Sequence, residues 1–268
     1  MKTELLHICD LSTGYGKAGR HQPVAAGLNG SLPRATLTAL IGPNGAGKST
    51  LLRTLAGLQP ALAGQVELDG QPLAAYTPRA LARTVGIVLT KRVEALHLSV
   101  RQVVEAGRMP YTGLTGRLTS ADTHAVDHAM ELTRTTGFAD RMIHTLSDGE
   151  RQRVMIAKAL AQDTPLILLD EPTAFLDVRG KVELLELLRQ LVRSCGRTIL
   201  LSSHDVELML AHADRLWLLQ GSTASDADSP QLIEGSTGQL LTDGTLTRFF
   251  ARQGLSFDGT FMKLGIRD

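Results

Sequence analysis

The sequence predicts an α/β fold in which a parallel or mixed sheet carries helices on both faces. Short apolar segments alternate with helical patterns through most of the 268 residues. A glycine-rich segment, GPNGAGKST at 42–50, separates an expected strand from an expected helix. A second apolar run, LILL at 166–169, ends in two acidic residues. Because α/β proteins bind ligands at the carboxyl ends of their strands, the acidic pair is expected beside a ligand.

The expected strands are short segments that alternate apolar with polar residues or are apolar throughout. The Asp69-Gly70 pair marks a hairpin turn after one of them. The first strand is expected to run into the turn-rich segment GYGKAG. In chain order, strands are expected at 5–11, 36–41, 66–68, 85–89, 166–169, 198–201 and 216–219.

The expected helices have apolar residues at helical spacing and recognisable ends. Gly57 is placed to end the first helix, Gly137 closes the third, and Ser99 with Gln102 forms a capping box. Because the stretch from about 91 to 163 is mostly helical, it is expected to be a subdomain inserted into the α/β core. In chain order, helices are expected at 48–55, from Pro78, at 120–135, after Asp177 and at 205–212.

Two segments near the C-terminus are less regular. Residues 220–230, QGSTASDADSP, are polar and rich in turn residues, which predicts a surface loop. Residues 246–265 are expected to form one helix and one strand packed on the core, without a recognisable motif.

Composition narrows the function classes. The net charge is +1 with both signs mixed along the chain, which gives no reason to expect a nucleic-acid surface. Cys9 and Cys195 lack metal-type spacing and are expected to be buried, reduced thiols in a reducing compartment. The N-terminus lacks the apolar core of a signal peptide, and no apolar run approaches the roughly 18 residues that span a bilayer. At a membrane, other chains would have to supply the membrane part.

The glycine-rich segment matches the phosphate-binding pattern G-x-x-x-x-G-K-[ST]. Its glycines let backbone N–H groups approach phosphate oxygens, and the helix that follows adds its dipole. Lys48 would pair with the β- and γ-phosphates, and Ser49 would offer its hydroxyl to Mg²⁺. The alternative is a glycine-rich turn without a ligand. The expected ATP-binding residues here are Gly42, Pro43, Asn44, Gly45, Ala46, Gly47, Lys48, Ser49 and Thr50.

The acidic pair follows an unbroken apolar run that suits a central strand. Asp170 would hold Mg²⁺ through its water shell, and Glu171 would orient or deprotonate the attacking water. The alternative is that two carboxylates merely cap the end of a strand. Upstream, Ser147 and Glu150 form another capping box at the start of an apolar-periodic helix. Taken alone, that pattern indicates only a well-capped helix.

The order of these three segments resembles that of the ATPase subunits of ABC transporters. In that family the capped helix points at the γ-phosphate of ATP held by a second subunit, and the residues matching this contact are Ser147, the backbone of Gly149, and Glu150. The resemblance implies a P-loop NTPase (RecA-like) core with a mixed sheet, an antiparallel β-subdomain and an inserted α-helical subdomain. It also implies a single domain over 1–268, with the helical subdomain at about 91–163.

Further matches extend the resemblance. The segment AFLD at 174–177 matches the family's loop across the dimer interface, and His204 matches a histidine that contacts the γ-phosphate. Tyr15 matches the aromatic residue that stacks on adenine. Thr90 stands where the family usually has glutamine, so its shorter hydroxyl would ligate Mg²⁺ or a water. Asp148 replaces a usual glycine, and its carboxylate is expected to point away from phosphate.

The segment GRMPYTG at 107–113 resembles ATPases that serve importers of iron–siderophore complexes, haem and cobalamin, although an ordinary helix end and loop is the alternative. The resemblance implies ATP and Mg²⁺ as cofactors. It implies a second copy of the chain, transmembrane permease subunits and, indirectly, a substrate-binding protein as partners, with no nucleic acid. The chain would lie peripherally on the cytoplasmic face of the inner (cell) membrane.

Two other functions stay open at this point. An ABC protein that acts on DNA or ribosomes usually carries two ATPase domains or large insertions, which this chain lacks. A P-loop kinase would need an acceptor site and a lid in place of the capped helix and His204. Binding to a hydrophobic membrane subunit would support an importer, whereas salt-sensitive binding to nucleic acid would support the first alternative.

Overall fold

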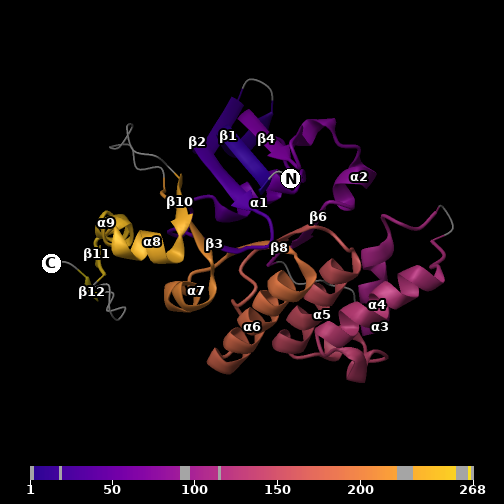
Figure 1. Cartoon of the computed structure of the whole chain (residues 1–268). Coiled ribbons are helices and arrows are strands. Elements are labelled where there is room, and N and C mark those ends of the chain that lie inside the picture. The colour runs from indigo at the N-terminus through magenta and orange to yellow at the C-terminus, as the bar shows by residue number, and fades with distance from the viewer. Residues whose placement is uncertain are drawn as a thin grey trace.

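The computed structural model describes residues 3–17, 20–90, 97–113, 116–221, 232–257 and 265–266. Its core is a six-stranded sheet, with an antiparallel sheet above it and a group of helices below and to one side (Figure 1). The order of the six strands is β10-β9-β3-β8-β7-β6, and every neighbouring pair is parallel except β10 with β9. The sheet is therefore mixed, as predicted. The six strands are β3 (Leu37–Ile41), β6 (Val85–Val88), β7 (Leu166–Leu169), β8 (Thr198–Ser202), β9 (Arg215–Leu219) and β10 (Leu232–Ser236).

Both faces of this sheet are buried, because successive side chains of a strand point to opposite sides. In β7, Ile167 and Leu169 join the core beneath α6 (Val178–Cys195) and α7 (Val206–His212). Leu166 and Leu168 join a second core under α1 (Lys48–Leu55) and the antiparallel sheet. This burial on both faces explains why the central strands are apolar throughout.

The antiparallel sheet has the order β2-β1-β4-β5. Its strands are β1 (Glu4–Lys17), β2 (Arg20–Pro33), β4 (Ala63–Leu68) and β5 (Gln71–Pro72). The expected hairpin turn is confirmed, since Asp69 and Gly70 have φ angles of 53° and 75° between β4 and β5. The expected turn at GYGKAG is wrong for Gly14 to Lys17, which continue β1 paired with β2. The apolar pattern of β2 is broken by Pro23 and two glycines, so its strand was missed.

The helices between β6 and β7 form a third group with a core of their own. They are α3 (Val100–Glu105), α4 (Ser120–Leu132) and α5 (Asp148–Ala161), with 3₁₀ turns at 106–108, 136–138 and 143–145. The capping box of Ser99 and Gln102 is confirmed. The expected end of α4 near Gly137 is wrong, because Arg134 with φ 55° turns the backbone out of the helix earlier.

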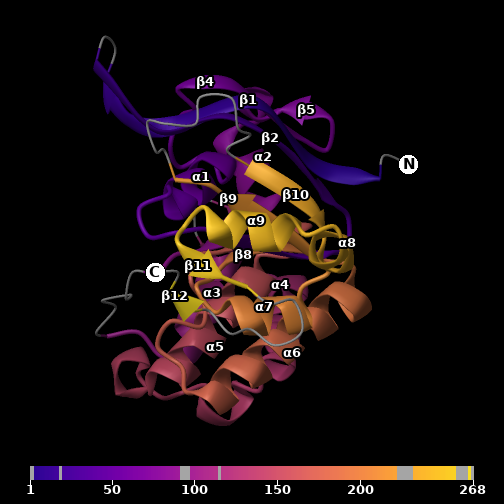
Figure 2. The ribbon, with the colours of Figure 1, turned by 90° about the vertical axis from the view of Figure 1, so that its left-hand side faces the viewer.

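The C-terminal elements pack on the edge of the six-stranded sheet. There α8 (Thr237–Thr242) and α9 (Thr245–Ala251) lie side by side next to β9 and β10 (Figure 2). The expected C-terminal helix is confirmed as α9, and short strands follow at β11 (Leu255–Ser256) and β12 (Gly265–Ile266). Residues 258–264, within the segment expected to form one helix and one strand, and residues 222–230 of the expected loop at 220–230 lie outside the described residues. Residues 91–96, at the start of the helical stretch, lie outside them as well.

Both cysteines are free, but the expectation that they are buried is wrong. Cys9 is exposed and Cys195 is half-buried. In β1 the side chains alternate, so Ile8 enters the core and Cys9 points outward. Within the described ranges, none of the helices combines the length and apolar character needed to cross a bilayer.

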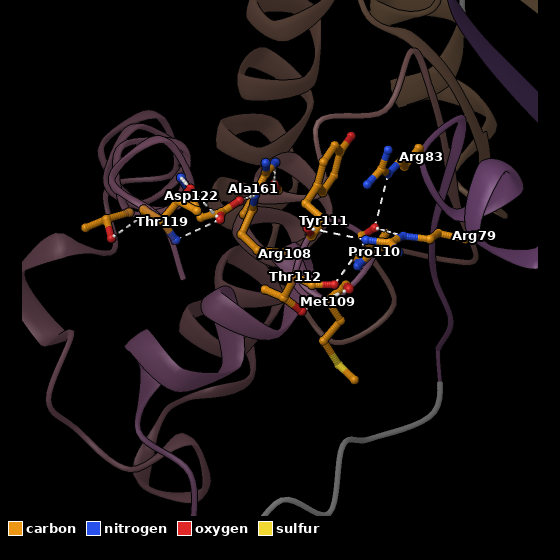
Figure 3. Close-up of polar contacts among 11 residues, drawn as sticks. Arg79, Arg83, Arg108, Met109, Pro110, Tyr111, Thr112, Thr119, Asp122 and Ala161 are labelled. Atoms are coloured by element: carbon orange, nitrogen blue, oxygen red, sulfur yellow. Dashed lines mark hydrogen bonds and ion pairs between the residues drawn. The ribbon is translucent and has the colours of Figure 1, made fainter. Parts of the chain in front are cut away.

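The short helix α2 (Pro78–Ala82) is fastened to the helical group through the GRMPYTG segment (Figure 3). Arg79 Nε and Arg83 Nε both donate to the carbonyl oxygen of Pro110, over 2.9 and 3.1 Å. The Tyr111 ring lies between two guanidinium groups, 4.6 Å from that of Arg83 and 3.8 Å from that of Arg108. Cation–π attraction and the charged hydrogen bonds thus join the α/β side to the helical insert.

Arg108 continues this connection into the helical insert (Figure 3). Its buried guanidinium contacts Asp122 Oδ1 on α4 over 2.9 Å and the Ala161 carbonyl on α5 over 2.7 Å. Asp122 also accepts hydrogen bonds from the N–H and hydroxyl of Thr119. These bonds, those from Thr119 first, lower the pKa of Asp122 to about 2. The carboxylate is therefore ionised and paired in the folded chain at neutral pH.

We predict that Asp122→Asn lowers the free energy of unfolding by about 3 kcal/mol at pH 7, because it leaves Arg108 buried without a counter-charge. A lowered folded pKa contributes stability above the unfolded value near 4, and this stability is lost as pH falls through 2. The gap between wild type and variant should therefore narrow from pH 5 to pH 2.5 in urea titrations. Asp127→Asn, on the same helix in a partly exposed pair with Arg101, is the control and should change stability by less than about 0.5 kcal/mol. A gap for Asp122→Asn that is independent of pH would contradict this account.

Candidate functional site

The phosphate-binding segment lies between β3 and α1, at the carboxyl edge of the six-stranded sheet. Gly45 and Gly47 have φ angles of 82° and 98°, a conformation that side-chain-bearing residues rarely adopt. A Cβ on Gly42 would come within 2.4 Å of the Leu219 carbonyl oxygen. Gly47 caps α1 without a side-chain hydrogen bond, so the first N–H groups of α1 face the loop. This is the backbone arrangement that binds phosphate.

Lys48 is buried at the start of α1 and turns its ammonium back over the loop. Its Nζ donates to the carbonyl oxygens of Gly42 over 2.8 Å and Pro43 over 3.1 Å. Burial lowers the pKa of Lys48, while the nearby charges of Glu171 and Asp170 oppose that shift. A phosphate group in the loop would supply the negative charge that this desolvated cation favours.

Asp170 lies directly after β7 and connects three parts of the sheet edge. Its Oδ1 accepts hydrogen bonds from Ser49 Oγ in the phosphate loop over 3.0 Å and from Ser202 Oγ on β8 over 2.9 Å. Only 4% of Asp170 is exposed. The predicted neighbours Ser49 and Asp170 are thus in direct contact, although 121 positions separate them in the chain.

Glu171 adopts a left-handed backbone conformation with φ 48°. Such a conformation in a residue other than glycine costs about 1–3 kcal/mol, and it is found at functional sites as well as in turns. Its N–H donates to Ser202 Oγ over 2.8 Å, and its carboxylate lies 2.5 Å from His204 Nε2. The structure therefore brings together the two residues that were predicted to be catalytic. Both side chains remain partly exposed, Glu171 at 28% and His204 at 43%.

Two further predicted residues lie close to this edge. Tyr15 is 51% exposed on β1, and its hydroxyl lies 3.2 Å from Thr50 Oγ1, so a flat aromatic face stands beside the phosphate loop. Thr90, after β6, donates its hydroxyl proton to the carbonyl oxygen of Asp170 over 2.9 Å. The adenine contact of Tyr15 and the metal contact of Thr90 stay predictions.

The capped helix α5 begins away from the phosphate loop. Ser147 Oγ accepts a hydrogen bond from the Glu150 N–H, and Glu150 accepts bonds from the N–H and hydroxyl of Ser147, as the capping box predicts. These bonds, the one from the Ser147 N–H first, lower the pKa of Glu150. The residues that line a cavity of about 320 Å³ at this helix start include Ser147 and Gly149 but none of the residues 42–50. The start of α5 and the phosphate loop therefore do not share this cavity.

Asp148 differs from the usual family residue, and its carboxylate is held by its own helix. Arg151 Nη1 donates to Asp148 Oδ1 over 2.7 Å, and Arg151 also contacts the Leu146 carbonyl. This pairing gives the extra negative charge a local counter-charge. The expectation that the carboxylate points away from phosphate stays a prediction.

The residues at the sheet edge fit Mg²⁺ bound together with a nucleotide. A hydroxyl from Ser49 and one carboxylate from Asp170 are the donors with which proteins hold Mg²⁺ when phosphates supply other ligands. Across the part of the chain that the structure describes, no three His, Cys, Asp or Glu side chains gather as an all-protein metal site would require.

Sequence comparison then decides the family. A family model described as ABC transporter matches residues 25–174. The chain belongs to the ABC transporter family. The ABC ATPase is 36% identical to the ferric enterobactin transport ATP-binding protein FepC of Escherichia coli over 248 residues, which cover 92% of this chain and 88% of FepC. It is 36% identical to the iron(3+)-hydroxamate import ATP-binding protein FhuC of Bacillus subtilis over 240 residues, which cover 90% and 85% of the two chains.

A solved structure supports the same fold. It is an inward-facing conformation of an ABC transporter assigned to the metal-chelate type, with a TM-score of 0.76 and 29% identity. The similarity covers 94% of this chain and 90% of that one. The predicted fold class of the ABC ATPase is therefore confirmed, and the P-loop kinase alternative is not supported.

One residue at the site was missed by sequence reasoning. Ser202 is fully buried and contacts both Asp170 and Glu171. Ser202 is the last residue of the apolar strand β8, and the register, which pairs Leu169 of β7 with Leu201 of β8, places it beside Asp170. Because that register depends on tertiary pairing, the contact could not be predicted from the segment SSHD alone.

We predict that Lys48→Ala lowers the affinity of the ABC ATPase for ATP by at least about 10-fold, since a hydrogen bond from a charged group contributes about 1.5–3 kcal/mol. Isothermal calorimetry with purified protein measures this directly. Arg53→Ala, which removes a positive charge from the same helix, is the control and should leave the dissociation constant within about twofold. Unchanged ATP affinity in Lys48→Ala would remove this lysine from the phosphate site.

Proposed function

We propose that this chain is the ATP-hydrolysing subunit of an importer for iron–siderophore complexes or a related metal chelate such as haem or cobalamin. The observation that carries the ATPase activity is the contact of Glu171 with His204 directly beside Asp170 and the phosphate loop. The chelate class is supported by the relatives, whose names refer to ferric enterobactin and iron(3+)-hydroxamate. The GRMPYTG segment supports the same class.

Hydrolysis in this proposal depends on positioning and charge stabilisation, without a covalent protein intermediate. The phosphate loop and Lys48 hold the triphosphate. Glu171 orients a water molecule and accepts its proton as the water oxygen bonds to the γ-phosphorus and the bond from that phosphorus to the bridging oxygen breaks, which releases ADP and inorganic phosphate. His204, 2.5 Å from the Glu171 carboxylate, keeps that carboxylate in place and contacts the γ-phosphate. Bound Mg²⁺, held by Ser49 and, through its water shell, by Asp170, would neutralise phosphate charge.

A second copy of the chain completes the site in this proposal. The start of α5, with Ser147 and Gly149, would approach the γ-phosphate held by the other copy. This is supported by the separation of the two halves within one chain, since the cavity beside Ser147 includes no phosphate-loop residue. Glu150 would support the contact through its capping bonds to Ser147.

Transmembrane permease subunits would bind at an apolar groove beside the C-terminal end of α1. A cavity of about 820 Å³ lies there between α1, β4, α2 and α5, and its walls are mostly apolar. Leu58, at its rim, is 61% exposed. An amphipathic helix of a permease fits such a groove. The chain would then lie peripherally on the cytoplasmic face of the cell membrane, and a substrate-binding protein would contact the permease rather than this chain.

We predict that Glu171→Gln slows ATP turnover by about 10²- to 10⁴-fold while ATP still binds, because the amide cannot accept the proton of the attacking water. Gel filtration with ATP should then show a stable dimer. Adding Ser147→Ala should abolish that dimer, and Glu186→Gln on α6 is a control that should turn over ATP at the wild-type rate. Full activity in Glu171→Gln, or a dimer that still forms after Ser147→Ala is added, would contradict the proposal.

We also predict that the tagged chain captures polytopic permease subunits from detergent-solubilised membranes of its own cells. Leu58→Glu should reduce the captured amount at least about 10-fold, because a charge at the rim would have to lose its water on docking. Gln239→Glu on α8 introduces the same charge far from the groove and should not change capture. Mass spectrometry identifies the partner, and salt-sensitive capture of nucleic acid instead of a permease would contradict the importer assignment.

A further inference from the structure

The peptide group between Asp170 and Glu171 is held from both sides by side-chain hydroxyls. Thr90 Oγ1 donates to the carbonyl oxygen of Asp170 over 2.9 Å. On the other side, the N–H of Glu171 donates to Ser202 Oγ over 2.8 Å. Both polar atoms of this one peptide are therefore bonded to side-chain hydroxyls, one from the end of β8 and one from just after β6.

The strand register explains why these hydroxyls meet the same peptide. In the order β6-β7-β8, Val88 pairs with Leu169, and Leu169 pairs with Leu201. Parallel strands keep the same direction, so the residues that follow each strand stay side by side. Thr90 comes two positions after Val88, and Ser202 comes one position after Leu201.

The orientation of this peptide controls where the Glu171 carboxylate points. The φ angle of Glu171 describes rotation about the bond that joins the peptide nitrogen to its Cα, and here it is 48°. Without such hydrogen bonds, a glutamate backbone favours φ angles outside the left-handed region. Fixing the peptide plane through both of its polar atoms opposes that rotation. It thereby keeps the side chain directed at His204, whose Nε2 lies 2.5 Å from Oε1.

We propose that Thr90 and Ser202 are positioning residues that hold the Asp170–Glu171 peptide and so aim the Glu171 carboxylate at the attacking water. Thr90 then acts through the main chain and not as a ligand of Mg²⁺. This inference rests on the proposed function, because it takes Glu171 as the base. Ser202 serves Asp170 as well, since its hydroxyl donates to Asp170 Oδ1. Thr90 contacts the carbonyl alone among the bonds described, which makes it the cleaner residue to test.

The test is single-turnover hydrolysis of ATP by the full chain, with ATP affinity measured in parallel. Thr90→Val keeps the shape and removes the hydroxyl, and it should slow hydrolysis by about 10- to 100-fold, the usual effect of a small misplacement of a reacting group. The ATP dissociation constant should stay within about twofold. Thr90→Ser restores the donor and should recover the rate to within about threefold of wild type.

A matched control is available at the other end of β6. Thr84 Oγ1 donates to the Ala80 carbonyl oxygen over 2.9 Å, so Thr84→Val removes the same kind of bond away from the site. Its rate should equal that of wild type. If Thr84→Val and Thr90→Val slow hydrolysis alike, the effect of Thr90→Val reflects general loosening of the fold, and the inference is overturned.

Two further measurements separate positioning from metal binding. In a Glu171→Gln background, adding Thr90→Val should change the remaining rate by less than about twofold. A glutamine at this position cannot act as the base in any orientation, so its positioning no longer affects the rate. The Mg²⁺ concentration for half-maximal rate should be the same for wild type and Thr90→Val. A raised Mg²⁺ requirement, or full additivity of the two changes, would assign Thr90 to the metal and overturn the inference.

The failure of this inference can be told apart from failure of the proposed function. If the wild-type chain does not hydrolyse ATP, or if Glu171→Gln is fully active, the proposed function is wrong and the inference falls with it. If Glu171→Gln is slow but Thr90→Val matches wild type, the proposed function stands and the positioning role of Thr90 is wrong.

Discussion

The buried carboxylate of Asp170 is the interaction on which the rest of the site depends. A carboxylate at this depth is costly unless its oxygens are hydrogen-bonded, and the cost amounts to several kcal/mol per unpaired ion. Ser49 in the phosphate loop and Ser202 on β8 both donate to Asp170 Oδ1. These two bonds hold the phosphate loop, the end of β7 and the end of β8 together.

This constraint is local to the six-stranded sheet, and the second half-site is built differently. Its position depends on the helical group, which has its own core and is joined to the α/β side by arginines. Within that group, the buried Arg108 pairs with Asp122 on α4. Arg108 also donates to the carbonyl oxygen of Ala161 at the C-terminal end of α5, whose N-terminal end is capped by Ser147. In the proposed dimer, the edge of the sheet would bind ATP within its own chain, whereas α5, which packs on both the sheet core and the helical core, would serve the partner copy.

Much of the fold could be predicted, for reasons that particular elements make clear. The strands at β3, β7 and β8 are apolar throughout because both of their faces are buried, and such runs are easily recognised. In contrast, β2 contains Pro23 and two glycines and was missed, because long-range pairing with β1 outweighs its weak local preference. The outward side chain of Cys9 could not be predicted either, since it follows from which face of β1 meets the core.

Local sequence patterns predict the chemistry of the site: a glycine loop of fixed spacing, an acidic pair after an apolar strand and a capped helix. Each of these patterns spans only a few residues, and the residue type at each position follows from a local requirement such as backbone conformation, charge or helix capping. Which of these groups are in contact depends on the folded chain, because contacts such as Ser49 with Asp170 and Glu171 with His204 arise from the order and register of parallel strands. That register depends on the packing of both sheet faces, which no single segment encodes.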